Sequence, residues 1–209
     1  MGIEPVVALL FGIGLVVAPL ELGYLFIQGK RRNGTWSLSG VIDYDERFSA
    51  RQIARWTAPL VLWWIVILAI SIAVLDSWLA DTVFGWYPES IRDMATFDGG
   101  GDTPATWLLV VLFAAALALN GVIGPVAEEL YFRGHLLPRI DRFGRAAPVL
   151  NTVLFSIYHF WSPWQNLARI VGLLPWVYVV WRKRSVQLSI AVHVTANTFF
   201  LLLLVPALV

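Results

Sequence analysis

Cysteine is absent from the 209 residues of this sequence. The absence excludes disulfides, a thiolate nucleophile and every metal site built on cysteine. Charged residues are scarce as well, at 14%, whereas a typical soluble domain contains about 25%. Because 58% of the residues are hydrophobic and the mean hydropathy is +0.71, the sequence predicts a polytopic membrane protein that forms one compact bundle.

Two common hydrolase motifs are missing too. There is no HExxH, which excludes the zincin arrangement, and no GxSxG nucleophile elbow. A cleavable signal peptide is not indicated either, because Glu4 is the only charged side chain before Glu21 and the apolar stretch over residues 3–27 is too long. We therefore predict a retained membrane anchor at the start of the chain.

Long apolar runs predict the membrane-spanning helices, each of which needs roughly 20 mainly apolar residues. About six spans are expected, over residues 3–27, 56–79, 104–138, 146–161, 166–181 and 186–208. The third run is too long for one straight crossing, and Gly121, Gly124 and Pro125 predict a kink or a break into two helices. The predicted fold class is an all-α transmembrane helical bundle in which this kinked or broken helix carries an EExxxR motif.

Charges outside the spans predict the topology. Basic residues cluster at 30–32, 47–55, 139–145 and 182–184, while the loop 76–103 is acidic. Six spans with both termini outside put every basic cluster in the cytoplasm, as the positive-inside rule requires. We therefore expect a multi-pass protein of the plasma membrane, divided into residues 1–103 and 104–209. A short amphipathic helix is expected on the cytoplasmic surface within residues 33–55.

Ionisable side chains at membrane depth are costly, so each one is a candidate for function. Glu129 and Arg133 are four residues apart on one helix, in the order that favours an ion pair. Glu128 lies about 100° away around that helix and needs another partner. Glu21, in the first span, is expected to pair with a basic residue near the cytoplasmic end. Arg169 is unexpected in the short fifth span.

The remaining candidates are His159, His193 and Asn197, of which the last two share one face of the last span. Counted from the basic ends of their helices at about 1.5 Å per residue, Glu128, His159, His193 and Asn197 reach similar depths, roughly 12–20 Å. Such a group can deprotonate a water molecule and stabilise an oxyanion. It can also bind a metal ion. Each side chain taken alone is also compatible with a structural polar contact between helices, which is the favoured interpretation for a lone histidine at position 159.

Three ordered motifs resemble those of the CAAX protease and bacteriocin-processing family of intramembrane endopeptidases. They are EELYFRG (residues 128–134), FSIYH (155–159) and HVTAN (193–197), which correspond to EExxxR, FxxxH and HxxxN/D. The resemblance covers residues 104–209 and implies a protease core there. It implies that Glu128 and His159 activate water, that His193 and Asn197 stabilise the oxyanion, and that Glu129 and Arg133 support the motif helix.

The resemblance also frames the cofactor and the partners. It permits a divalent metal ion such as zinc on Glu128, His159 and His193, and equally a metal-free glutamate mechanism. A peptide or membrane-protein substrate and the membrane lipids are the expected partners, and no basic–aromatic pattern indicates nucleic-acid binding. Two alternatives remain: a non-catalytic membrane scaffold or bacteriocin self-immunity protein on the same fold, and a small transporter, although no repeated halves are found.

Overall fold

The computed structural model describes residues 4–89 and 105–203, and their regular elements are all helical. The first helical run joins α1 (Glu4–Phe11), a π-helical turn (Gly12–Val17) and α2 (Ala18–Asn33), and is followed by α3 (Ala50–Val74) and α4 (Asp76–Thr82). The second half contains α6 (Thr106–Ala116), α7 (Gly124–Glu129), α8 (Leu137–Arg139), α9 (Ala146–Tyr158), α10 (Asn166–Lys183) and α11 (Val186–Leu203). The all-α prediction is therefore confirmed.

Four helical runs are long and apolar enough to cross a membrane, namely Gly12–Asn33, Ala50–Val74, Thr106–Arg139 and Val186–Leu203. The other two predicted spans coincide with α9, which has 13 residues, and α10, which carries Arg169, Arg182 and Lys183. Many large apolar side chains of the long runs are exposed, including Leu20 at 67% and Leu62 at 63%. Lipid is the solvent that makes such a surface favourable, so the chain is an integral membrane bundle.

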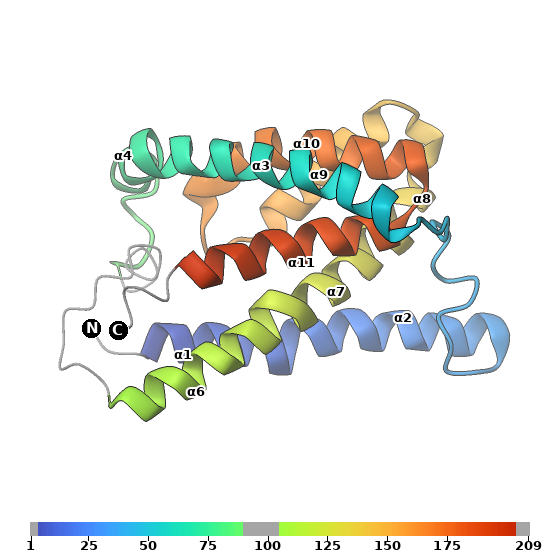
Figure 1. The fold of residues 1–209 in the computed structure, drawn as a ribbon, viewed down its shortest axis with the longest axis horizontal. Helices are drawn as coiled ribbons and strands as arrows, with labels where there is room; N and C mark the ends of the chain where they lie inside the picture. Colours follow the sequence, from blue (N-terminus) through green and yellow to red (C-terminus); the bar gives the residue numbers. More distant parts are fainter. Residues whose placement is uncertain (1–3, 90–104, 204–209) are drawn as a thin grey trace.

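The third predicted span is one continuous helical run of 34 residues. Two π-helical turns interrupt its α-helical geometry, η3 (Leu117–Ile123) and η4 (Leu130–Leu136), with α7 between them. Such turns often accompany functional sites and change the direction of a helix. At about 1.5 Å per residue the run is roughly 51 Å long, well beyond the ~30 Å hydrocarbon core, and it lies obliquely across the bundle (Figure 1).

The helices form a bundle whose centre is occupied by α7 and α11 (Figure 1). On one side lie α3, α9 and α10, which pack against one another or against α11; on the other side, α2 packs against α7. The buried core between them contains Phe132, Phe155, Trp176 and Val192. This packing brings the three motif segments of the second half to the middle of the bundle.

The predicted amphipathic helix in residues 33–55 is wrong. Residues 34–49 form turns and extended chain that cover the end of the bundle where the basic clusters lie. Asp43 N–H donates to Gly134 O at 3.0 Å and Val186 N–H donates to Tyr44 O at 2.9 Å, and both Tyr44 and Val41 are 1% exposed. The segment is held by the main chains of the motif helix and α11, which fixes these two helices relative to each other.

The start of α3 explains why this segment is not helical. Ser49 and Gln52 form a capping box, in which each side chain bonds the other residue's main chain, so α3 begins at Ala50 rather than near residue 56. A capping box satisfies N–H groups that a helix leaves free at its first turn. Residues before Ser49 are therefore kept outside the helix.

The structure describes only part of the acidic loop predicted over residues 76–103, because residues 90–104 lie outside the described ranges. The predicted division of the chain at residue 103 lies outside these ranges as well. In the described part, α4 begins at Asp76, whose carboxylate accepts hydrogen bonds from Ser71 Oγ at 2.5 Å and from Gln165 Nε2 at 3.1 Å. These bonds join α3 and α4 to the segment that precedes α10.

Candidate active site

Glu129 on α7 is the most completely paired carboxylate of the bundle centre. It is fully buried, and its Oε1 lies 3.1 Å from Arg133 Nη1 and 2.8 Å from His193 Nδ1. Its Oε2 accepts a hydrogen bond from Ser189 Oγ. The predicted Glu129–Arg133 pair is therefore present, and the same carboxylate also holds an imidazole of α11.

The Arg133 guanidinium is surrounded by aromatic rings. It is 0% exposed and lies 4.1 Å from the Phe155 ring centroid and 5.4 Å from that of Trp176. Within the described ranges its nitrogens complete no well-aligned hydrogen bond, although one of them lies at ion-pair distance from Glu129. Coulombic attraction and the negative faces of the rings therefore compensate the buried charge.

Three further polar side chains support this arrangement, and sequence reasoning missed them. Trp176 Nε1 donates to Ser189 Oγ at 2.9 Å, so that Ser189 links the indole to Glu129. Asn151 Nδ2 donates to Phe132 O at 2.9 Å and ties α9 to the motif helix. Ser189 lies four residues before His193, and this shared helix face was a usable signal, whereas no pattern marked Trp176 or Asn151.

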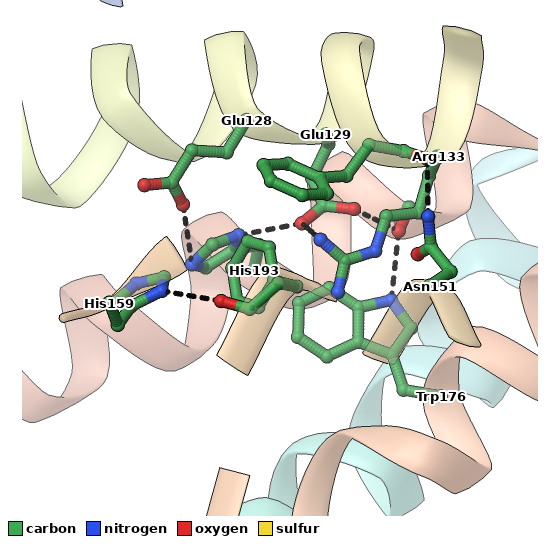
Figure 2. A network of polar contacts seen from close by, with 10 residues as sticks. Glu128, Glu129, Arg133, Asn151, His159, Trp176 and His193 are labelled. Atoms are coloured by element: carbon green, nitrogen blue, oxygen red, sulfur yellow. Dashed lines mark hydrogen bonds and ion pairs between the residues drawn. The ribbon is translucent and has the colours of Figure 1, made fainter. Parts of the chain in front are cut away.

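His193 lies between the two adjacent glutamates (Figure 2). Its Nδ1 contacts Glu129, while its Nε2 is 3.8 Å from Glu128 Oε2. Glu128 and His193 are 8% and 7% exposed. A separation of 3.8 Å is too long for a direct hydrogen bond, and it allows one water molecule to bond both groups from the side. Glu128 has no other ion-pair partner among the described residues.

His159 lies on the Glu128 side of His193 (Figure 2). It forms the C-cap of α9, with φ −81° and ψ 50°, and is half-buried. Its Nδ1 is 2.9 Å from Phe155 O, so the proton of the neutral ring belongs on Nδ1 and Nε2 is left free to accept. The ring packs on Phe155 and Trp161, with centroids 4.6 Å and 4.9 Å away.

Arg169, unexpected in the sequence, anchors the segment that follows His159. Its guanidinium donates to Ser162 O at 3.0 Å and also to Ser162 Oγ. It donates further to Gln165 Oε1 at 3.0 Å and to Asn166 Oδ1 at 3.1 Å. The buried cation thus bonds the turn between α9 and α10 at several points and holds His159 in place indirectly.

One predicted candidate, Asn197, lies outside the immediate contacts of the glutamates, as does His135 on the motif helix. Asn197 Nδ2 donates to Asn120 O at 2.9 Å, in the π-helical turn η3, and is one helical turn beyond His193. Its second amide hydrogen and its carbonyl oxygen are not committed to any other described residue. His135 is buried under the covering segment, with Nδ1 3.2 Å from Val41 O.

Glu21 corrects a prediction from the sequence. It was expected to pair with a basic residue, but it forms no ion pair with any described residue. The side chain is 7% exposed, and neither carboxylate oxygen completes a hydrogen bond. Glu21 lies near the start of α2, roughly 18 Å from Asn33 at the other end of the same helix. The helix therefore places Glu21 inside the bundle and away from the basic end.

The centre of the bundle contains side chains of the types that bind metal ions. Glu128, His159 and His193 supply the right atom types, and the two free Nε2 atoms are suitable ligands. However, no three His, Asp or Glu side chains in the described part of the chain converge as metal ligands do. The arrangement therefore does not support the description of this protein as metalloprotease-like.

Residues 101–199 match the family described as type II CAAX prenyl endopeptidase Rce1-like. This match, to a family of proteases, confirms the resemblance predicted from the three motifs.

A curated relative gives a second comparison. The uncharacterised protein YyaK of Bacillus subtilis (strain 168) is 32% identical over 103 residues, which cover 44% of this chain and 33% of YyaK. The chain thus aligns with about a third of the length of that relative. No solved structure matches the chain.

Proposed function

We propose that this protein is an intramembrane endopeptidase of the CAAX-protease type, which hydrolyses a peptide bond with water activated by Glu128. The observation that carries the proposal is the position of His193, held through Nδ1 by Glu129 with Nε2 directed at Glu128. A carboxylate next to an oriented imidazole is an arrangement that both activates water and stabilises negative charge. The family match over residues 101–199 supports the same reaction class.

The base in this mechanism is Glu128. Glu129 already accepts hydrogen bonds from His193 and Ser189 and lies at ion-pair distance from Arg133, whereas Glu128 keeps its oxygens available. Glu128 accepts a proton from the water as the oxygen attacks the carbonyl carbon of the substrate. When the carbon–nitrogen bond breaks, Glu128 returns that proton to the departing amine, so the carboxylate is regenerated.

The oxyanion is stabilised by His193 and Asn197. Nδ1–H of His193 donates to Glu129, so Nε2 donates to the oxyanion when the ring carries a second proton. Asn197 contributes the amide hydrogen that Asn120 does not use. His159, with Nδ1 directed at Phe155 O, accepts a hydrogen bond from the attacking water through Nε2. Glu129 and Arg133 act as positioning residues, because they touch His193 and the core rather than the substrate.

The substrate in this proposal is a peptide or a membrane protein, presented within the lipid bilayer of the plasma membrane. The basic clusters face the cytoplasm and both termini lie outside. The orientation can be tested directly, because the chain contains no cysteine and each single-cysteine variant has one labelling site. The orientation is wrong if a membrane-impermeant maleimide labels position 142 of intact cells.

The function is tested by reconstituting the protein in liposomes with a peptide library, prenylated and unprenylated, and comparing wild type with Glu128→Gln, His159→Ala and His193→Ala. Glu46→Gln is the matched control, because this glutamate has an exposed side chain at the basic end of the bundle. We expect cleavage by wild type and the control and a large loss in the other three. Equal cleavage by all variants excludes Glu128 as the base.

Two further arms separate the alternatives. If no variant cleaves any peptide while the cellular phenotype survives Glu128→Gln, the protein is a scaffold or immunity protein. A metal-free mechanism predicts that cleavage persists after treatment with a zinc chelator and that the purified active protein contains no stoichiometric metal. Loss of cleavage on chelation with recovery on added zinc would support the metal-dependent mechanism instead.

A further inference from the structure

Glu21 and Tyr158 are a polar pair that the proposed mechanism does not use. Glu21 belongs to α2 and Tyr158 is the last residue of α9. The carboxylate and the phenol hydroxyl approach within interaction range of each other. Nevertheless, both oxygens of Glu21 and the hydroxyl of Tyr158 are inaccessible to solvent and complete no well-formed hydrogen bond with a described residue.

The pair adjoins the candidate active site. The helix that carries Glu21, α2, packs against α7, which carries Glu128. Tyr158 also packs edge-on against His159, with ring centroids 5.2 Å apart. Glu21 thus adds a carboxylate to the centre from a helix outside residues 101–199, which the family match covers.

Polar atoms at membrane depth that complete no well-formed hydrogen bond are costly. Buried polar groups in native proteins are nearly always hydrogen-bonded, and water is scarce in the bilayer interior. A bound molecule that supplies the missing partners would remove this cost. The pair offers acceptors on Glu21 and a donor on Tyr158, which match the N–H and C=O groups of an extended peptide main chain.

The place of the pair in the fold is suited to such a ligand. In the described part of the bundle, α2 packs against α7 and η4, and α2 and α9 are not among the closely packed helix pairs. The two residues therefore meet through their long side chains. A peptide that enters between α2 and α9 separates these side chains without breaking the packing of α7 against α11.

We propose that Glu21 and Tyr158 form a binding site for the main chain of the substrate next to the scissile bond, in which the Tyr158 hydroxyl donates to a substrate carbonyl and Glu21 accepts from a substrate N–H. This inference rests on the proposed endopeptidase function. It adds substrate positioning by α2 to a reaction otherwise carried out by the second half of the chain.

The first test measures kcat and KM for cleavage of a model peptide by Tyr158→Phe, Glu21→Ala and Glu21→Gln. One lost hydrogen bond to the substrate raises KM about tenfold, with kcat changed by less than about threefold. Glu21→Gln keeps an acceptor and raises KM less than Glu21→Ala. Tyr24→Phe is the control, because it removes a phenol hydroxyl from α2 one turn from Glu21, and we expect unchanged kinetics.

The second test replaces single amides of the peptide, around the cleavage site, by esters that lack the N–H. At the position bonded by Glu21, the ester raises KM for wild type but causes no further increase for Glu21→Ala. This non-additivity identifies a direct contact, and altered packing of the bundle does not produce it.

The outcomes separate the two proposals. If wild type cleaves no peptide, the proposed function is wrong and the inference falls with it. If wild type cleaves but Tyr158→Phe and Glu21→Ala both keep the wild-type KM, the binding site is wrong while the function stands. Equal and additive effects of the ester in wild type and Glu21→Ala also overturn the direct contact.

Discussion

The two sides of the Glu128–Glu129 pair differ in how completely their polar atoms are bonded. On the side of Glu129, hydrogen bonds join a carboxylate, an imidazole, a hydroxyl and an indole, and a guanidinium lies at ion-pair distance from the carboxylate. On the side of Glu128, the nearest ion-pair partner is His193 at 3.8 Å, and Glu21 and Tyr158 complete no hydrogen bond. A single helical turn therefore has a bonded side and an unbonded side.

The difference separates stability from reactivity. A connected network of buried hydrogen bonds and ion pairs makes the core more rigid and specific. Unbonded polar atoms cost free energy of folding, and native proteins keep them mainly where function requires them. Consecutive residues of a helix point about 100° apart, so adjacent glutamates can belong to the two sides at once.

The largest effect that sharpens this comparison is expected on the unbonded side. In Glu128→Gln the base is lost while the shape is kept, and we expect kcat to fall by about 10²- to 10⁴-fold. The free energy of unfolding should change by less than about 1 kcal/mol, because no strong bond of Glu128 is removed. Peptide cleavage and thermal unfolding in detergent, measured on one preparation, check both parts. A large loss of stability would place Glu128 on the bonded side instead.

On the bonded side, Arg133→Met should destabilise the protein by roughly 3–5 kcal/mol, because it leaves the Glu129 charge buried without its cation. Unfolding in detergent, followed by circular dichroism, measures this loss. Arg142→Met is the control, since Arg142 is exposed and near the basic end. Similar stability of the two variants would mean that the buried pair contributes nothing to folding.

A smaller effect is expected for Ser189→Ala. Removing the hydroxyl leaves Glu129 Oε2 and the Trp176 indole N–H without their shared partner, which costs about 1–3 kcal/mol. The same unfolding measurement checks this prediction. Ser185→Ala is not a suitable control, because the Ser185 hydroxyl donates a hydrogen bond to Glu46 O. Ser39→Ala, in the exposed part of the covering segment, is the appropriate comparison.

The smallest effect should have the opposite sign. Tyr158→Phe removes a buried hydroxyl that completes no hydrogen bond, so the free energy of unfolding should stay constant or rise by up to about 1 kcal/mol. Its stability without substrate is compared with that of Ser189→Ala in the same detergent. Destabilisation of both variants by equal amounts would remove the distinction between the bonded and the unbonded side.

Much of the fold followed from the sequence because each signal was local. Apolar runs placed the helices within a few residues, and the i,i+4 spacing placed the Glu129–Arg133 pair. The start of α3 was missed by several residues, because the Ser49–Gln52 capping box extends the helix beyond its apolar run. The covering segment 34–49 was misjudged for a related reason: its main-chain bonds are made to residues far away in the sequence.

For the same reason, the candidate site could be predicted only in part. The estimated depths in the membrane predicted that His193 lies near the glutamates. They did not show that Glu129 holds Nδ1 of His193 while Nε2 faces Glu128. The expectation that Glu21 pairs with a basic residue failed, since counting along one helix says nothing about which helix lies opposite. Trp176 and Asn151 carried no spacing signal at all.

By itself, the sequence determined that the chain would be a membrane bundle and that the side chains of two adjacent glutamates on one helix would point in different directions. Both results follow from hydrophobicity and from the 3.6-residue period of the helix, which act within a single element. Only the tertiary structure decided which carboxylate is bonded and which is left open. That choice depends on the packing of α2, α9, α10 and α11 around α7, and contacts between distant segments are set by the packing of the whole bundle.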